Sequence, residues 1–295
     1  MRQGFFGYGL GIGLALLAGA CAGRGGAGTL ASNAYGDYLT AVYARGLGDQ
    51  ERARRSYIGL VAKEPGNARL LESAYSFFIF NGDLDYALAA ARRLNALDPE
   101  HTPTGMLLAL DAFRGRDFAA MEARLAQVKG FAFDTLMAPL LRGWAFAMAG
   151  QDDNSLQALA PLAKTKSFEP FYTEHRAFIL DYAGRTAEAE GAYRAILGRD
   201  KRLTLQPVLA LAAILQKQGE PAEAEKLLRE FAAKAPGNVE IGAAITALGK
   251  GQSLDSVAGH PDRAIAAAFL RVAADLGGER AFLPAVVYAR FALFL

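Results

Sequence analysis

The fold of this chain is decided by the stretch Gly184-Arg185-Thr186-Ala187-Glu188-Ala189-Glu190-Gly191-Ala192-Tyr193-Arg194-Ala195-Ile196. A largely apolar helix is expected to end at Gly184, and Ala189 and Tyr193 then lie four residues apart, on one face of a second helix. Similar turns recur at Gly48-Asp49, Gly82-Asp83, Arg116-Asp117, Gly150-Gln151 and Gly219-Glu220. The first residues of successive turns are separated by 34, 34, 34, 34 and 35 positions. Self-similarity at this period predicts a solenoid of stacked helical hairpins.

Positions counted from the first residue of each turn repeat the same residue classes. Seven positions before it, five of the six residues are small: Ala41, Tyr75, Ala109, Gly143, Ala177 and Ala212. Five positions after it they are mostly small: Ala53, Ala87, Met121, Ser155, Ala189 and Ala224. Nine positions after it they are apolar or tyrosine: Tyr57, Ala91, Leu125, Leu159, Tyr193 and Leu228. Small residues where two helices cross allow close approach, so six tightly packed helix pairs are expected.

This pattern resembles that of the tetratricopeptide-repeat (TPR) family, which combines small residues at the helix crossing with a proline after the second helix. Pro65, Pro99 and Pro236 occupy that proline position in repeats one, two and six. Asn67 and Asn238 follow two of these prolines and are expected to cap the next helix. Repeats three, four and five depart from the pattern, because they carry Phe133, Ser167 and Lys201 instead. The resemblance covers residues 34–238 and implies an all-α, right-handed superhelical solenoid of TPR helical hairpins.

Residues 239–295 leave this register. We expect a short helix over 239–248, a helix over 262–276, a turn at Gly277-Gly278 and a last helix over 284–295. The last helix is too apolar to close a solenoid, since end repeats need a polar outer face. Either the chain continues beyond Leu295, and this hairpin is truncated, or a partner covers this end.

The N-terminus has the composition of a secretory signal. Arg2 precedes the uncharged, apolar residues 5–20, and Cys21, the one cysteine of the chain, follows Leu17-Ala18-Gly19-Ala20. This resembles the lipobox of bacterial lipoproteins and implies a signal peptide over 1–21 with Cys21 lipidated. The alternatives are an ordinary cleaved signal with an incidental cysteine, and an uncleaved anchor helix.

The lipoprotein resemblance also implies a location. Ala22, rather than aspartate, follows Cys21, which implies the bacterial outer membrane, facing the periplasm, with inner-membrane anchoring as the alternative. Residues 22–33 are rich in glycine and are expected to form a flexible tether, with Asn33 capping the helix that follows.

Composition excludes several classes of function. Of the 295 residues 52% are hydrophobic, and the net charge of +2 comes from interleaved acidic and basic residues with no basic stripe, so nucleic-acid binding is not expected. His101, His175 and His260 are isolated from one another in sequence, and neither a glycine-rich phosphate loop nor a marked carboxylate pair is present in the mature chain. We therefore expect no catalytic, metal or cofactor site and no small-molecule substrate.

A binding surface remains. In TPR arrays the first helix of every repeat lines the concave face, so the resemblance implies a groove for a protein or peptide. The predicted groove residues are Tyr38, Arg69, Phe80, Met106, Phe113, Trp144, Met148, Phe171, Phe178 and Tyr182. The alternative for each ring is that it packs as core against a neighbouring repeat. Trp144 is the predicted central anchor.

The sequence thus favours a non-enzymatic interaction scaffold tethered to the envelope. The resemblance to TPR lipoproteins implies a role in outer-membrane, pilus, secretion or cell-wall assembly. A second hypothesis is a polysaccharide- or cell-wall-binding accessory protein whose concave aromatic rings stack on sugars. A third is a purely structural spacer, which would tolerate loss of those rings.

Overall fold

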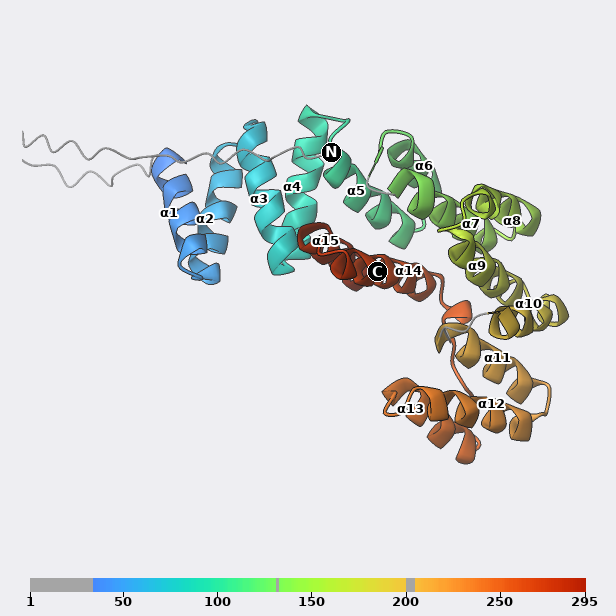
Figure 1. The fold of residues 1–295 in the computed structure, drawn as a ribbon. Helices are drawn as coiled ribbons and strands as arrows, with labels where there is room; N and C mark the ends of the chain where they lie inside the picture. Colours follow the sequence, from blue (N-terminus) through green and yellow to red (C-terminus); the bar gives the residue numbers. More distant parts are fainter. Residues whose placement is uncertain (1–33, 131–132, 200–204) are drawn as a thin grey trace, which may run out of the picture. The chain divides into compact units, whose positions relative to one another are not determined.

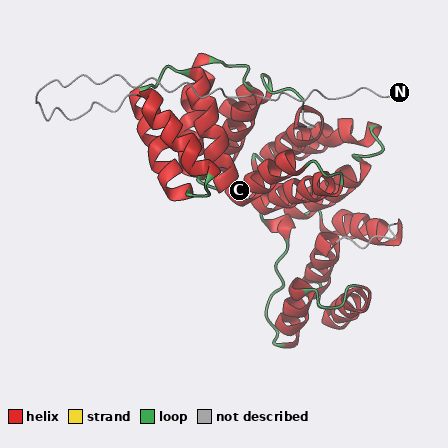
Figure 2. Cartoon of the chain, turned by 60° about the vertical axis from the view of Figure 1, so that its left-hand side comes forward, coloured by secondary structure: helices red, strands yellow, loops and turns green. Residues whose placement is uncertain are grey.

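The computed structural model describes residues 34–130, 133–199 and 205–295, and the elements within these ranges are helices, without a strand (Figures 1 and 2). The first helices of the six hairpins are α1 (Ala34–Gly46), α3 (Ala68–Asn81), α5 (Thr102–Arg114), α7 (Ala138–Met148), α9 (Glu169–Tyr182) and α11 (Leu205–Lys217). The second helices are α2 (Gln50–Lys63), α4 (Leu84–Leu97), α6 (Phe118–Leu125), α8 (Asp152–Leu159), α10 (Thr186–Arg199) and α12 (Pro221–Lys234). The predicted signal, Cys21, tether and Asn33 cap lie outside the described residues.

All six turns share one backbone geometry. The first turn residue is left-handed in every repeat: Gly48 (φ 78°), Gly82 (81°), Arg116 (61°), Gly150 (70°), Gly184 (72°) and Gly219 (85°). In each turn the next residue donates its N–H to the carbonyl four positions before the turn residue, as Arg185 does to Leu180 over 2.9 Å. This is the Schellman motif, in which the left-handed residue satisfies carbonyls that the helix end leaves open. The period of the sequence is therefore the period of a helix C-cap.

Two glycines of the same repeat should respond to alanine with opposite signs. A Cβ at Gly184 or at Gly191 meets no atom within 4 Å, so backbone conformation alone decides the outcome. Gly184→Ala forces an L-residue into the left-handed region and should cost about 1 kcal/mol of the free energy of unfolding. Gly191→Ala, inside α10, should add about 0.5–1 kcal/mol. Urea denaturation followed by circular dichroism measures both, and two changes of the same sign would contradict the turn geometry.

The small positions predicted from the period form the contact between the two helices of each hairpin. Ala41, Ala109, Ala177 and Ala212 are fully buried. In the fourth hairpin Gly143 takes this place, and a Cβ there would come within 2.8 Å of Leu159. Neighbouring hairpins then stack, with α2 on α3, α4 on α5, α10 on α11 and α12 on α13. The core is therefore a continuous row of apolar side chains along the stack.

Helix caps and surface ion pairs complete the hairpins. The side chains of Asn67 and Asn238 accept the N–H groups of Leu70 and Ile241 at 3.2 and 3.0 Å, which confirms both predicted caps.

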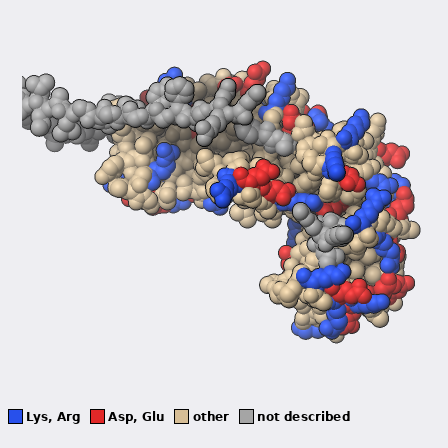
Figure 3. All heavy atoms as spheres, in the orientation of Figure 1, with Lys and Arg blue, Asp and Glu red and all other residues tan. Residues whose placement is uncertain are grey.

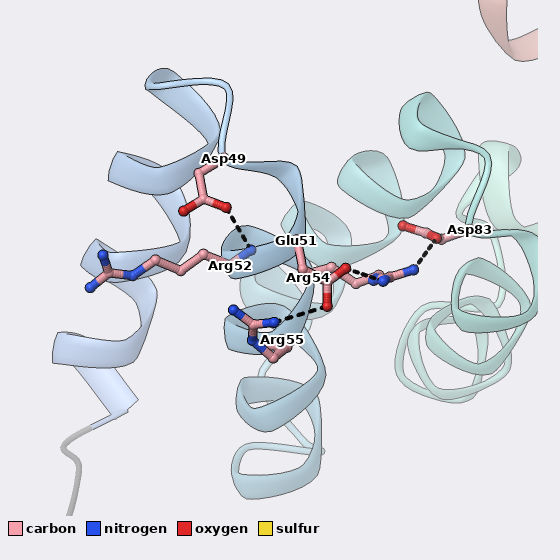
Figure 4. A network of polar contacts seen from close by, with 6 residues as sticks. All are labelled: Asp49, Glu51, Arg52, Arg54, Arg55 and Asp83. Carbon is pink, nitrogen blue, oxygen red and sulfur yellow. Dashed lines mark hydrogen bonds and ion pairs between the residues drawn. The ribbon is translucent and has the colours of Figure 1, made fainter.

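A polar network joins the first two repeats (Figure 4). Arg54 contacts Glu51 on its own helix and Asp83 in the next repeat, the latter at 3.3 Å, while Asp49 caps α2. The Arg54–Asp83 contact is part-buried and links the two repeats, whereas the contacts with Glu51 are solvent-exposed and contribute little to stability.

Two of the three repeats that lack the terminal proline, the third and the fourth, have short second helices. Helices α6 and α8 contain 8 residues each, whereas α2, α4, α10 and α12 contain 14. After α8 the chain forms a 3-10 segment, η2 (Ala160–Lys164), which contains Pro161. Proline has no backbone N–H and so cannot donate the hydrogen bond that would continue the α-helix. A π-helical turn, η1 (Phe133–Met137), leads into α7.

The first two helices of the C-terminal region end in the same turn motif as the repeats, but the last two helices do not continue the stack. Helix α13 (Val239–Gly249) packs on α12 and ends in the same motif at Gly251. A connection with one 3-10 turn, η3 (Val257–Gly259), then leads to a hairpin of α14 (Pro261–Gly278) and α15 (Phe282–Phe294). Its left-handed turn residue is Arg280 (φ 62°), two positions later than the predicted Gly277-Gly278 turn.

This hairpin folds back on the repeats instead of extending them. Helix α15 contacts α3, and α14 contacts α7 and α9 (Figure 1). The expectation that the apolar last helix stands at the open end of the stack is wrong, because α13 occupies that position on α12. None of the helices described here is long and apolar enough to cross a membrane.

Candidate interaction surface

The ten predicted groove residues differ in their accessibility. Met106, Phe113, Trp144, Phe171 and Phe178 are buried, Tyr38 and Met148 are half-buried, and Arg69, Phe80 and Tyr182 are exposed. Their part in partner binding stays a prediction. The exposed members lie at the start and the end of α3 and at the end of α9.

The middle set does not form an open wall of rings. Trp144 is 0% exposed, and Phe113 and Phe178 are buried against rings of their own hairpins, Phe118 at 6.5 Å and Tyr193 at 5.9 Å between centroids. The expectation of an accessible ring at 144 is therefore wrong. The physical reason is that the indole lies between two repeats, where it packs against His175 and Tyr182 of α9.

Trp144 is held by a buried hydrogen bond to the next repeat. Its indole Nε1 donates to Nδ1 of His175 over 2.9 Å, and the ring of Tyr182 packs edge-on at 5.7 Å. Because indole nitrogen only donates, the accepting Nδ1 carries no proton and the imidazole is neutral with its proton on Nε2. Burial, and next the cation of Arg271, lower the pKa of His175 to about 3. The pair is a structural clamp between α7 and α9.

The inner side of the repeats carries a different set of groups, and these receive α14. Asp262 accepts two hydrogen bonds from the Arg116 guanidinium, at 2.9 and 2.7 Å. Arg271 donates to Glu174 over 2.9 Å and lies 4.6 Å over the ring of Phe171. One helix thus spans the repeats from α5 to α9.

Helix α15 contacts the same side of the earlier repeats. Arg290 donates to the main-chain carbonyl of Phe80 over 3.0 Å. In the opposite direction Arg114 donates to the carbonyl of Phe294 over 3.1 Å and lies 4.0 Å over the Phe294 ring. Both contacts use main-chain oxygens, and the Arg114 contact adds a cation over an aromatic ring.

We call the repeat residues that meet this hairpin the inner surface: Phe80, Arg114, Arg116, Phe133, Phe171 and Glu174. The set contains three rings, two guanidinium groups and one carboxylate. The apolar part includes Phe133, whose ring lies 6.3 Å from that of Phe269. On the face of the molecule in Figure 3, basic and acidic side chains are interspersed. The chemistry of the inner surface suits a helix with an apolar stripe and charges of both signs.

The seam between α14 and the repeats is not completely filled. A cavity of about 160 Å³ lies among α9, α11 and α14, lined in part by Phe171, His175, Ala264 and Arg271. A second hollow, of about 580 Å³, lies between α9 and α10 and is lined by charged and apolar side chains. Among the described residues no cluster of three or more histidine, cysteine or carboxylate side chains could hold a metal ion.

Sequence reasoning placed Phe80 and Phe171 on the first helices but missed the residues of the hairpin that meet them. Asp262, Arg271 and Arg290 lie outside the repeat register, so counting by period assigns them no position. One signal was present: Arg116 stands where the other five turns have glycine. A side chain retained in a left-handed position, at a cost of about 1–2 kcal/mol, indicates a contact that compensates for the strain.

Comparison with known proteins gives the fold. No protein-family model and no curated protein sequence matches the chain. A tetratricopeptide repeat protein from Parabacteroides merdae ATCC 43184 is similar over 75% of this chain and 86% of its own, with a TM-score of 0.50 and 17% identity. PilW, a type IV pilus biogenesis factor, is similar over 71% of this chain and 97% of its own, with a TM-score of 0.49 and 17% identity. A structure of Naa15/Naa10 bound to HypK-THB is similar over 82% of this chain and 37% of its own, with a TM-score of 0.47 and 17% identity. Together with the recurring turns, the first of these likenesses shows that the described chain is an all-α solenoid of tetratricopeptide-repeat hairpins.

Proposed function

We propose that this protein is a non-enzymatic scaffold that holds a protein partner on the inner surface of its repeats, at the bacterial envelope. One observation carries the proposal: the inner surface already binds a helical hairpin of the same chain. It does so through ring contacts, ion pairs of both polarities and hydrogen bonds to main-chain carbonyls. These are the means by which a protein surface recognises a helix.

The polysaccharide reading is less well supported. Stacking on sugar rings requires exposed aromatic faces, and Trp144, Phe113 and Phe178 are enclosed. The exposed ring nearest to them is Tyr182, which is 38% exposed at the end of α9. A protein partner can bind through one partly exposed ring together with charged side chains, and the inner surface supplies the charges.

The envelope part of the proposal rests on the sequence of the N-terminus. A lipid on Cys21 would hold the repeats at a membrane through the tether of residues 22–33. The described helices supply no membrane span of their own.

Photocrosslinking in cells tests both parts. A crosslinking amino acid replaces Tyr182 on the first helix α9 or, as a matched control, Tyr86 on the second helix α4, which is 44% exposed. We expect a discrete protein adduct from position 182 and none from position 86. In a Cys21→Ser background the scaffold should leave the membrane fraction and the adduct should weaken.

Three outcomes would overturn the proposal. Equal adducts from both positions would mean non-specific contact, and capture of polysaccharide would favour the sugar-binding hypothesis. If Phe80→Ala combined with Tyr182→Ala left every cellular phenotype of the deletion fully complemented, with no adduct, the protein would act as a spacer.

A further inference from the structure

We infer that hairpin α14–α15 is a built-in occupant of the inner surface, and that the partner is a protein that displaces it with an amphipathic helix of similar chemistry. This deepens the proposed function and rests on it for the existence of a partner. The partner helix that fits this surface carries an apolar stripe with aromatic residues, a carboxylate that pairs with Arg116 and a cation that pairs with Glu174.

The hairpin is consolidated mainly within itself. The ring of Phe269 in α14 lies 5.5 Å from that of Tyr288 and 5.8 Å from that of Phe291, both in α15. The two helices pack more extensively on each other than either packs on the repeats. The turn at Arg280 is closed by the same hydrogen bonds as the repeat turns. The hairpin can therefore move as one body without losing its own core.

Part of its attachment to the repeats is polar and near solvent. The Arg116–Asp262 pair is partly exposed on both sides, and pairs of this kind contribute little to stability. Polar attachment that water can replace is suited to exchange. A cavity of about 160 Å³ lies under α14, so the apolar part of the seam is imperfectly packed.

The connection to α14 is anchored, which keeps the hairpin close. The side chain of Gln216 donates to the carbonyl of Gln252 and accepts the N–H of Leu254, both over 2.7 Å. Ala258 in η3 is fully buried. The hairpin can thus pivot only after Gly259, and a short tether of this kind maintains a high local concentration of the displaced competitor.

The closed arrangement is the resting one. The outward face of α15 already exposes Phe282, Leu283 and Leu293, and release would also expose Phe294, which Arg114 of the repeats covers. Opening without a partner would uncover this apolar surface to water. The hairpin should leave only when another apolar helix covers the inner surface.

A labelled peptide of residues 261–295 serves as the probe of occupancy, added in trans to the full chain. Asp262→Arg places two cations together in the chain while Arg116 stays available to the peptide. We expect this variant to bind the peptide about tenfold more tightly than the wild type. Asp275→Arg, the same charge change at an exposed position of α14, should bind as the wild type does. The double variant Arg116→Asp/Asp262→Arg restores the pair within the chain, and its new carboxylate at position 116 repels the peptide, so binding should fall back.

A distance measurement shows whether the hairpin itself moves. Spin labels at Leu97→Cys in α4 and Leu283→Cys in α15, in a Cys21→Ser background, should give one distance in the parent and a second, longer one in Asp262→Arg. Equal peptide affinity for all variants, or an unchanged distance distribution, would overturn the inference. If the variants bind the peptide as expected but position 182 gives no adduct in cells, the inference that the hairpin is displaceable is supported and the proposed protein partner is contradicted.

Discussion

Trp144→Ala should lower the free energy of unfolding by about 3–5 kcal/mol, the usual loss for a large aromatic ring removed from a core. The ring is 0% exposed and fills the contact between the fourth and fifth repeats. The substitution also leaves Nδ1 of the buried His175 without its donor, which adds the cost of an unsatisfied polar group. Urea denaturation followed by far-ultraviolet circular dichroism measures the loss, since the variant has no tryptophan to report by fluorescence.

Tyr182→Ala is the matched control. Its ring touches Trp144 but stays 38% exposed, so its removal should cost less than about 1 kcal/mol. A loss below about 1 kcal/mol for Trp144→Ala would contradict the buried placement and return this ring to the groove. Failure of a Trp144 variant to capture a partner is otherwise explained by unfolding, which makes Tyr182 the better position for a binding test.

The fold was predictable because its signal is local. A left-handed residue followed by a helix start recurs every 34 or 35 positions, and each such turn is decided by a few consecutive residues. The small residues at Ala41, Ala109 and Ala177 are likewise determined by their own hairpin. Local rules that repeat six times leave few alternatives to a solenoid.

The occupied inner surface was not predictable in the same way. Arg290 and Phe80 are 210 positions apart, and Arg116 and Asp262 are 146 apart. No period links them, and the apolar composition of 284–295 indicates burial without saying against what. The burial of Trp144 also depends on a second repeat, because its hydrogen-bond partner His175 lies 31 positions later. The repeat register predicts that the first helices face the concave side. It does not predict whether another segment of the chain covers that side.

Mild acid should weaken the protein through His175. Burial and the Arg271 cation lower the pKa of this residue to about 3 in the folded chain, whereas an unfolded histidine titrates near 6.5. The unfolded state therefore takes up the proton first as the pH falls. The stabilisation is complete above pH about 6.5 and is lost progressively toward pH about 3, at roughly 1.4 kcal/mol per pH unit. Between pH 7 and pH 5 the loss from this one group should be about 2 kcal/mol.

The contacts of His175 explain why its pKa is lowered. Protonation of Nδ1 would point an N–H at the indole N–H of Trp144 and would place a second cation near Arg271. Carboxylates whose pKa values are lowered, such as Glu188 and Glu190, lose their contribution only below about pH 4.5. Burial raises the pKa of Asp181, so this carboxylate acts in the opposite direction as the pH falls, and a variant at position 175 is needed to separate the two.

His175→Asn supplies the comparison that decides the assignment. The amide oxygen can accept from Trp144 as Nδ1 does, but the side chain does not titrate in this range. The variant should be less stable than the wild type at pH 7, because the ring packing is lost, and its further loss at pH 5 should be smaller by about 2 kcal/mol. Denaturation curves of both proteins at the two pH values measure the difference. An equal acid loss in both would mean that another group carries it and that the clamp between α7 and α9 does not exclude the proton.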